Sequence, residues 1–329
     1  MTNLTAKTEN VSQRDKFTDP DKTQDGSERA KVALTKLETL WFNTGTLCNI
    51  ECENCYILSS PTNDALAYIK EDEVTPYLDE IAALDLGTRE IGFTGGEPFM
   101  NPDMIAMAEA ALSRGFEVLI LTNAMAPMMR PKIKTGLLSL LARYGKQLTL
   151  RISLDHYSAA LHDAERGKGA FEKSAEGLSW LSEHGFQITI AGRSFSNEVE
   201  SDARAAYAAL FKERGWAIDA DDAMSLVIFP EMDETAEVPE ITSECWDILG
   251  LAPSDIMCAS SRMIVKRRGE TSPKVLPCTL IPYRADFEMG KSLAASLNAD
   301  EGMFDNGAVK LCHVHCAKFC VLGGGSCSS

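Results

Sequence analysis

The stretch "TLWFNTGTLCNIECENCY", residues 39–56, decides how this chain folds, because a short apolar run is followed at once by three cysteines. The run "TLWFN" predicts a buried β-strand. Cys48, Cys52 and Cys55, with the spacing CxxxCxxC, then lie on a loop at the carboxyl end of that strand. In a barrel of alternating strands and helices, this end carries the active site.

The three thiols are one fewer than a tetrahedral metal site needs. Structural zinc sites take four ligands, usually grouped as two pairs. An iron–sulfur cube, in contrast, can be held through three of its irons, with the fourth left free to bind and activate another molecule. Two alternatives stay open on spacing alone: a zinc site completed by a distant ligand, and buried cysteines with no role.

Composition narrows the classes of partner. The 329 residues carry 32 Lys and Arg against 48 Asp and Glu, a net charge of -16 that repels phosphate backbones and anionic lipids. We therefore expect no nucleic acid and no membrane as partners. The first residues lack the apolar run of a signal peptide, and no segment has the length of a membrane span. We expect a cytoplasmic protein, where ten cysteines favour metal binding or catalysis over disulfides.

Residues 1–31 are polar, with isolated apolar residues only, and we predict that they form a disordered arm. After them, short β-rich runs alternate with helical stretches, which is typical of a parallel sheet wrapped by helices. Six such runs follow one another: residues 39–43, 90–94, 117–122, 148–153, 186–192 and 224–229. Because a closed barrel has eight strands, we predict an α/β fold with a partial, open-sided (β/α)6 barrel over residues 32–231.

The pattern changes after the sixth run. Residues 232–257 include the acidic stretch "MDETAEVPEITSE" and are predicted to be a linker, and the alternation of strands and helices stops there. Residues 258–329 are rich in Pro, Gly and Cys and poor in long periodic segments. We predict a small C-terminal domain that needs added crosslinks to hold itself together.

A second motif stands at the end of the second predicted strand, "TGGEP", residues 94–98. Gly95 and Gly96 allow the backbone to approach a ligand closely, and Glu97 offers a carboxylate to an ammonium group. Alone, the motif also suits an ordinary turn between a strand and a helix.

Together, the two motifs resemble those of the radical S-adenosylmethionine (radical SAM) enzymes, in order and in strand position, across roughly residues 39–231. The resemblance implies a [4Fe-4S] cluster whose free iron chelates the amino and carboxylate groups of S-adenosylmethionine. It also implies reductive cleavage to a 5'-deoxyadenosyl radical that abstracts hydrogen from the substrate. A low-potential electron donor, flavodoxin-like or ferredoxin-like, is the implied partner.

The same resemblance assigns site residues. Cys48, Cys52 and Cys55 would ligate the cluster. The cofactor would be contacted by Tyr56 near the adenine, by Gly95, Gly96 and Glu97 at the amino group, and by Asn123, Ser153 and Arg193 from later strand ends. Thr122 and Asp155 lie at the same rim. Thr, Asn and Ser at strand ends also commonly cap helices, and Arg193 has many acidic neighbours to pair with.

The segment "DHYSAALHDAERGKGAFEKSAEGLSWL", residues 155–181, resembles members of the family that carry extra clusters near the C-terminus. His156 and His162 fall within it, and we interpret both as polar residues near helix starts and not as catalytic groups. The sixth strand, "SLVIFP", lacks the glycine that many members have there. The residues that frame the adenine on that side stay open.

The C-terminal part resembles the SPASM and twitch extensions of the family, which hold auxiliary clusters. The implied metal ligands are Cys258, Cys278, Cys312, Cys316, Cys320 and Cys327. The spacing CxxxCxxxC before Cys327 departs from the usual pattern, so one or two auxiliary [4Fe-4S] clusters are implied. A second would need an outside ligand such as Cys245, His313 or His315, or a substrate atom. A structural zinc knuckle is the alternative, against which stands the Gly-rich turn "GGGSC".

We thus predict a radical SAM oxidoreductase or maturase in which the auxiliary cluster assists an oxidation or a bond formation. The substrate is either a peptide or protein side chain or a small metabolite. A non-catalytic iron–sulfur or zinc protein that senses redox state or scaffolds an assembly is the rival hypothesis, and it predicts no cleavage of S-adenosylmethionine.

Overall fold

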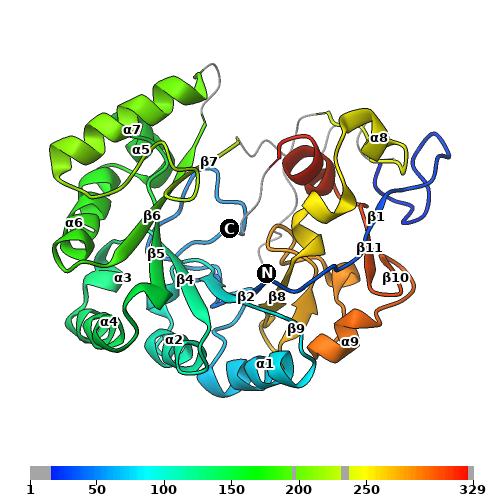
Figure 1. Cartoon of the computed structure of the whole chain (residues 1–329), viewed down its shortest axis with the longest axis horizontal. Coiled ribbons are helices and arrows are strands. Elements are labelled where there is room, and N and C mark those ends of the chain that lie inside the picture. Colours follow the sequence, from blue (N-terminus) through cyan, green and yellow to red (C-terminus); the bar gives the residue numbers. More distant parts are fainter. Residues whose placement is uncertain (1–15, 195–197, 231–236, 325–329) are drawn as a thin grey trace.

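The computed structural model describes residues 16–194, 198–230 and 237–324. Six parallel strands form most of one sheet, in the spatial order β7-β6-β5-β4-β3-β2. Their bounds are β2 Thr39–Asn43, β3 Glu90–Thr94, β4 Glu117–Thr122, β5 Leu148–Ser153, β6 Gln187–Arg193 and β7 Leu226–Phe229. These are the six predicted strands, and the prediction of a partial, open-sided barrel is confirmed (Figure 1).

Helices cover the outer face of the curved sheet (Figure 1). They are α1 Glu71–Ala83, α2 Met104–Leu112, α3 Ala126–Met129, α4 Pro131–Tyr144, α5 Ala159–Arg166, α6 Ala170–Glu183 and α7 Glu200–Arg214. In α1, Val74, Tyr77, Leu78 and Ile81 are buried, which is the spacing of one helix face. Pro131 begins α4 with its fixed φ. Such local signals place the helices between the strands.

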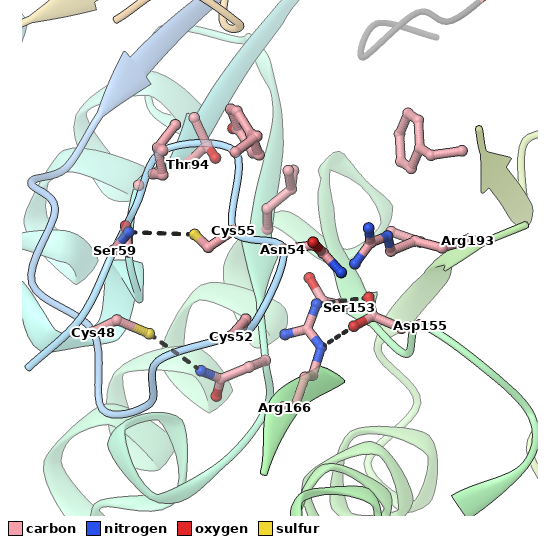
Figure 2. Close-up of a pocket in the computed structure, with 18 of the residues that line it drawn as sticks. Cys48, Cys52, Asn54, Cys55, Ser59, Thr94, Ser153, Asp155, Arg166 and Arg193 are labelled. Atoms are coloured by element: carbon pink, nitrogen blue, oxygen red, sulfur yellow. Dashed lines mark hydrogen bonds and ion pairs between the residues drawn. The ribbon is translucent and has the colours of Figure 1, made fainter. Parts of the chain in front are cut away.

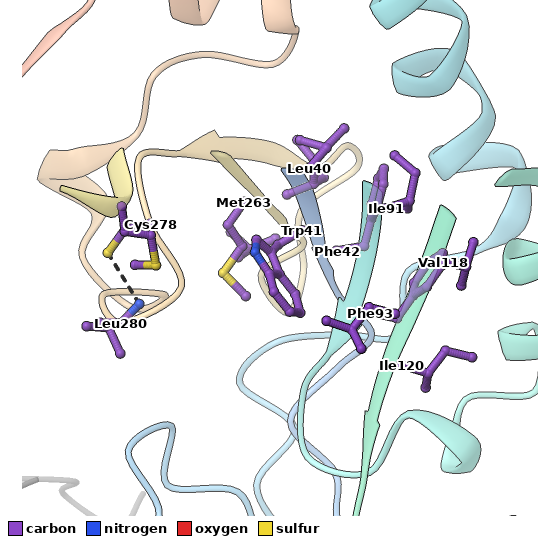
Figure 3. Packing of buried hydrophobic residues seen from close by; sticks show 14 of the residues in the cluster. Leu40, Trp41, Phe42, Ile91, Phe93, Val118, Ile120, Met263, Cys278 and Leu280 are labelled. Carbon is purple, nitrogen blue, oxygen red and sulfur yellow. Dashed lines mark hydrogen bonds between the residues drawn. The ribbon is translucent and has the colours of Figure 1, made fainter. Parts of the chain in front are cut away.

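The core lies between the sheet and these helices, and also inside the barrel. All five residues of β2 are buried, as expected for a parallel strand covered on both faces. Leu40 and Phe42 pack with residues of β3 and β4, while Trp41 lies on the other face near Met263 (Figure 3). Gly92 is opposite Trp41 in the β2–β3 register, and a Cβ there would lie 2.4 Å from the indole. A small residue is therefore required beside this large one.

The sheet does not end at β2. Strand β8, Ser261–Val265, pairs parallel with β2, and β9, Lys274–Leu276, pairs antiparallel with β8. Among the described residues, β7 and β9 are the two edges, so the sheet is open. The predicted C-terminal domain beginning at residue 258 thus shares a sheet with the barrel. Its need for added crosslinks stays a prediction.

The rest of the C-terminal part consists of short elements. They are helices α8, Cys245–Leu249, and α9, Leu293–Leu297, and strands β10, Phe304–Asp305, and β11, Ala308–Lys310, which pair with each other. Residues Cys316–Val321 form one turn of π-helix. Turns of this kind are rare and occur frequently at functional sites.

The prediction of a disordered arm is wrong for residues 16–31, and residues 1–15 lie outside the described residues. The guanidinium of Arg29 is fully buried and lies 2.6 Å from the carboxylate of Glu240. It also donates to the carbonyls of Asp19 and Leu311. Strand β1, Lys31–Val32, then pairs with β11. The partners that order this segment are more than 200 positions away, so its polar composition could not show them.

Candidate active site

The three predicted cluster cysteines line one pocket at the carboxyl ends of the strands (Figure 2). Cys48 is buried, and Cys52 and Cys55 are half-buried. The loop that carries them is fixed at both ends: the backbone N–H of Cys48 donates to Ser60, and that of Glu53 donates to the carbonyl of Glu165. The fold therefore brings the three thiols together at the predicted face of the barrel.

Burial strongly disfavours free thiolates in this loop. It raises the pKa of Cys48 to about 12 and the pKa of Cys52 to about 11, and the charges of the neighbouring thiols add to the effect on both. Without a cation, Cys48 and Cys52 are therefore protonated near neutral pH, and a bound metal would have to displace these protons.

The donor set fits a cube better than a single ion. Among the described residues, no group of three or more His, Cys, Asp or Glu is placed to hold one metal ion. An iron–sulfur cube keeps its thiolate ligands farther apart than one ion does, and three thiols around a pocket leave a position free for a second molecule. The residues present are thus compatible with the predicted open cluster.

Gly95 and Gly96 pack against the backbone of the cysteine loop. The backbone N–H of Gly96 donates to the carbonyl of Gly45 at 2.9 Å, and that of Glu97 donates to Leu47 at 3.1 Å. A Cβ on Gly96 would lie 2.3 Å from the carbonyl oxygen of Leu47, and Gly95 has a φ of +146°. The two glycines therefore allow the loop before Cys48 to pack closely against the end of β3.

We expect Gly96→Ala to reduce cluster binding, because the methyl group would push the backbone of residues 45–47 away and displace Cys48. The measurement is iron bound per chain after anaerobic reconstitution, with circular dichroism as a check on folding. Gly136→Ala in α4 is the matched control: its Cβ meets only side-chain atoms of Ile105, which can move, and alanine favours a helix by about 1 kcal/mol over glycine. Equal iron in both variants would contradict this role.

Glu97 has protein partners in place of the expected ammonium group. Its carboxylate is 1% exposed and does not line the pocket. It accepts hydrogen bonds from the hydroxyl of Thr122 at 2.9 Å and from the backbone N–H groups of Asn123 and Phe99. Burial raises its pKa, and these donors oppose that shift. The carboxylate thus fixes the end of β4 behind the pocket wall, and its contact with the cofactor stays a prediction.

The other predicted cofactor residues do reach the pocket. Its lining includes Tyr56, Gly95, Gly96, Thr122, Asn123, Ser153, Asp155 and Arg193. The side-chain amide of Asn123 lies 3.9 Å from the sulfur of Cys48 and donates to Asn49 at 3.0 Å. Tyr56 comes from the cysteine loop after β2 and the others from the ends of β3 to β6, so the sheet assembles them as predicted. What each of them binds stays a prediction.

Sequence reasoning missed the role of α5, which ends with Glu165 and Arg166. The guanidinium of Arg166 binds Asp155 through two hydrogen bonds of 2.7 and 2.8 Å (Figure 2). Although burial opposes charge on both groups, each ion favours the other, so the pKa of Asp155 is lowered and that of Arg166 raised. Arg166 also lines the pocket. In the sequence, the charged residues Glu165 and Arg166 of the run "HDAERG" were the signal for this role.

Glu165 links the cysteine loop to β6. Its carboxylate accepts from the side-chain amide of Asn54 at 3.0 Å and pairs with Arg193 at 2.9 Å. Arg193 therefore has an acidic partner at the pocket, which was the alternative weighed for it.

Neither His156 nor His162 lines the pocket. His162 is fully buried, packs edge-on against Phe171, and has no hydrogen-bond partner at either ring nitrogen. Burial lowers its pKa to about 4, so the ring is neutral near pH 7. The carboxylate of Asp163 instead accepts from the backbone N–H groups of Gly169 and Phe171 at the start of α6. Asp163 thus joins α5 to the start of α6.

The C-terminal cysteines gather from four separate places. Cys258 precedes β8, Cys278 follows β9, Cys312 follows β11, and Cys316 begins the π-helix. Burial raises the pKa of Cys316 well above its ordinary value, and the next largest contributions come from the charges of Cys278, Cys258 and Cys312. Cys316 thus lies near the three other thiols. Cys320 is half-buried on the π-helix, and Cys327 lies outside the described residues.

The C-terminal part also closes the pocket. Leu280, two residues after Cys278, and Phe319, between Cys316 and Cys320, both line it. The ring of Phe319 stacks on Phe229 of β7, with centroids 6.2 Å apart. Tyr283 donates to the carbonyl of Ile57 in the cysteine loop at 2.5 Å. One pocket therefore has the barrel thiols on one wall and the neighbours of the C-terminal thiols on another.

An open parallel barrel with a three-cysteine loop and a Gly-Gly turn at adjacent strand ends defines a cluster-binding enzyme of the barrel class. Residues 42–203 match the family model described as "Radical SAM superfamily". The predicted resemblance to the radical SAM enzymes is thus confirmed for this part of the chain. Members of the family bind a [4Fe-4S] cluster and S-adenosylmethionine, as predicted here.

Two curated relatives match the same part of the chain. The antilisterial bacteriocin subtilosin biosynthesis protein AlbA of Bacillus subtilis is 30% identical over 153 residues, 46% of this chain and 32% of that protein. The AdoMet-dependent heme synthase of Methanosarcina barkeri is 31% identical over 144 residues, covering 44% and 38%. The chain thus matches only about a third of the length of these relatives. Both relatives are named for a biosynthetic activity.

Among solved structures, Streptococcus suis SuiB bound to the precursor peptide SuiA superposes with a TM-score of 0.56 at 14% identity. The likeness covers 82% of this chain and 66% of that chain. At this identity it shows the fold alone. None of the described helices combines the length and apolar composition needed to cross a bilayer; a cytoplasmic location stays a prediction.

Proposed function

We propose that this chain cleaves S-adenosylmethionine reductively and uses the resulting radical to oxidise, or to form a bond in, a peptide or protein side chain. One observation carries the proposal: the three thiols of the cysteine loop and the neighbours of the C-terminal thiols line a single pocket. A substrate held there would lie between two groups of cluster ligands.

Cys48, Cys52 and Cys55 would hold the first cluster, and the pocket residues Tyr56, Gly95, Gly96, Asn123, Ser153 and Arg193 would hold S-adenosylmethionine. Bound there, the cluster would supply the electron that splits the sulfonium, and the 5'-deoxyadenosyl radical would take a hydrogen atom from the substrate. We propose that a flavodoxin-like or ferredoxin-like partner delivers that electron.

The chain's own residues would prepare the pocket in two ways. Apolar side chains, among them Ile57, Leu121, Phe229 and Phe319, exclude water from it, which protects a reactive intermediate from side reactions. The ion pairs Asp155–Arg166 and Glu165–Arg193 fix the strand ends against the cysteine loop without leaving a bare charge facing the substrate.

The peptide class is favoured by the names of two similar proteins, a bacteriocin biosynthesis protein and an enzyme solved with a precursor peptide. A small metabolite is the second candidate, because the heme synthase is just as similar in sequence. We propose in both cases that an auxiliary cluster bound by C-terminal cysteines assists the oxidation.

The first test is cleavage itself. The full chain is reconstituted anaerobically with iron and sulfide, reduced with dithionite and given S-adenosylmethionine, and 5'-deoxyadenosine is measured. We expect its formation. If none forms while the Cys48 site holds iron, the proposed function is wrong.

A second measurement separates the substrate classes. An extract of the source organism is divided by size, and each fraction is added to the cleavage assay before and after protease treatment. We expect the macromolecular fraction to increase 5'-deoxyadenosine formation and protease to remove the effect. Stimulation by the protease-resistant small molecules alone would favour the metabolite.

A further inference from the structure

Arg262, the second residue of β8, is a buried cation that its surroundings satisfy only in part. It is 1% exposed. Its Nη1 donates to the carbonyls of Cys258 and Ser261, at 2.6 and 2.8 Å, whereas Nε and Nη2 have no hydrogen-bond partner. No acidic side chain in the described ranges forms an ion pair with it, in contrast to Arg29 and Arg166. Burying a charge without an ion-pair partner and with unpaired donors destabilises the fold.

Two thiols stand near this guanidinium. Its Nη1 donates to the carbonyl of Cys258, and the antiparallel pairing of β8 with β9 brings Cys278 to the same end of the hairpin. Negative charge on either sulfur would act on Arg262, and also on Cys316. Neutral thiols are weak hydrogen-bond acceptors and supply no charge. Thiolates bound to iron would supply the missing negative charge, together with sulfur atoms that accept hydrogen bonds.

From this we infer that Arg262 is a positioning residue for an anionic iron–sulfur centre held by Cys258 and Cys278, whose charge it compensates and whose reduction it favours. The inference rests on the auxiliary cluster of the proposed function. Reduction adds one electron to the centre and makes it more negative, so a fixed cation beside it stabilises the reduced form more than the oxidised form. Hydrogen bonds to the cluster sulfurs and local charge are known to set such potentials.

If Arg262 had only a structural role, its hydrogen bonds would matter and its charge would not. The two hydrogen bonds from Nη1 hold the turn before β8, and an uncharged donor could replace them. The charge, in contrast, is lost in Arg262→Gln and kept in Arg262→Lys. The pair of variants therefore separates the role of the charge from that of the turn.

The test uses the full chain with Cys48, Cys52 and Cys55 all changed to Ala, so that only the C-terminal site binds iron. Iron, acid-labile sulfide and zinc are counted after anaerobic reconstitution, and the centre is titrated with reductant and followed by electron paramagnetic resonance. Arg151→Gln, which removes a buried guanidinium on β5, is the matched control. Because S-adenosylmethionine takes no part, the result is independent of the cleavage assay.

We expect Arg262→Gln to shift the one-electron equilibrium about tenfold toward the oxidised form, which is about 59 mV in potential. Arg262→Lys should keep most of the parent's potential, and Arg151→Gln all of it. Loss of iron in Arg262→Gln but not in Arg262→Lys would likewise support the inference. Three results would overturn it: an unchanged potential in Arg262→Gln, equal loss of iron in both variants, or zinc without sulfide in the parent.

Discussion

Changing Cys48 to Ala is expected to remove about four iron atoms per chain, the content of one cube, and to abolish formation of 5'-deoxyadenosine. Cys48 is the most deeply buried thiol of the loop. Its backbone is tied to Ser60, so neighbouring residues are not free to supply a substitute ligand. The measurements are iron and sulfide per chain after reconstitution, and 5'-deoxyadenosine with dithionite as reductant.

Glu51→Ala is the matched control for this variant, because Glu51 stands in the same loop but is exposed and does not line the pocket. It should keep the iron and the activity of the parent. An iron content in Cys48→Ala equal to that of Glu51→Ala would show that the loop is not the cluster site.

The second large effect is expected for Arg166→Met, which leaves the carboxylate of Asp155 buried without its partner. Breaking one side of a buried ion pair costs about 3–5 kcal/mol of the free energy of unfolding. The measurement is urea unfolding at pH 7. Arg268→Met is the control, because Arg268 and Asp64 form an exposed pair, for which about 0–1 kcal/mol is expected.

The loss in Arg166→Met should depend on pH. In the parent, Arg166 holds the pKa of Asp155 below its ordinary value, so the pair stabilises the fold above the carboxyl's unfolded pKa and loses this contribution as the pH falls through the lower, folded pKa. In the variant, burial without the cation raises that pKa, so protonation relieves the cost. The difference between the two proteins should therefore shrink from pH 7 to pH 5. A difference below 1 kcal/mol at pH 7 would contradict the proposed importance of the pair.

Local patterns were enough to predict the barrel strands and the face on which the site lies. Each strand of the barrel is a short run rich in apolar and β-branched residues, bounded by helical periodicity, and parallel strands place their carboxyl ends at one edge. The cysteine spacing and the Gly-Gly turn were enough to indicate the protein family, because each motif consists of residues close together in sequence. The positions of Asn123, Ser153 and Arg193 at the pocket followed from the same strand ends.

Contacts between distant segments could not be predicted in this way. The order of residues 16–31 depends on Glu240 and Leu311, and the partner of Asp155 lies on a helix whose amphipathic pattern says nothing of a buried ion pair. The motif also did not show that the carboxylate of Glu97 accepts hydrogen bonds from Thr122 and Asn123 at the end of β4; its contact with the cofactor stays a prediction.

The sequence alone thus determined the class of fold, the cysteine loop and the chemistry that three thiols and a Gly-Gly turn suit, since these properties are local. Only the tertiary structure decided that β8 extends the barrel sheet, that Phe319 and Leu280 line the same pocket as the cysteine loop, and that Arg262 is buried beside Cys258. These are relations between segments far apart in the chain, and they are set by how whole elements pack.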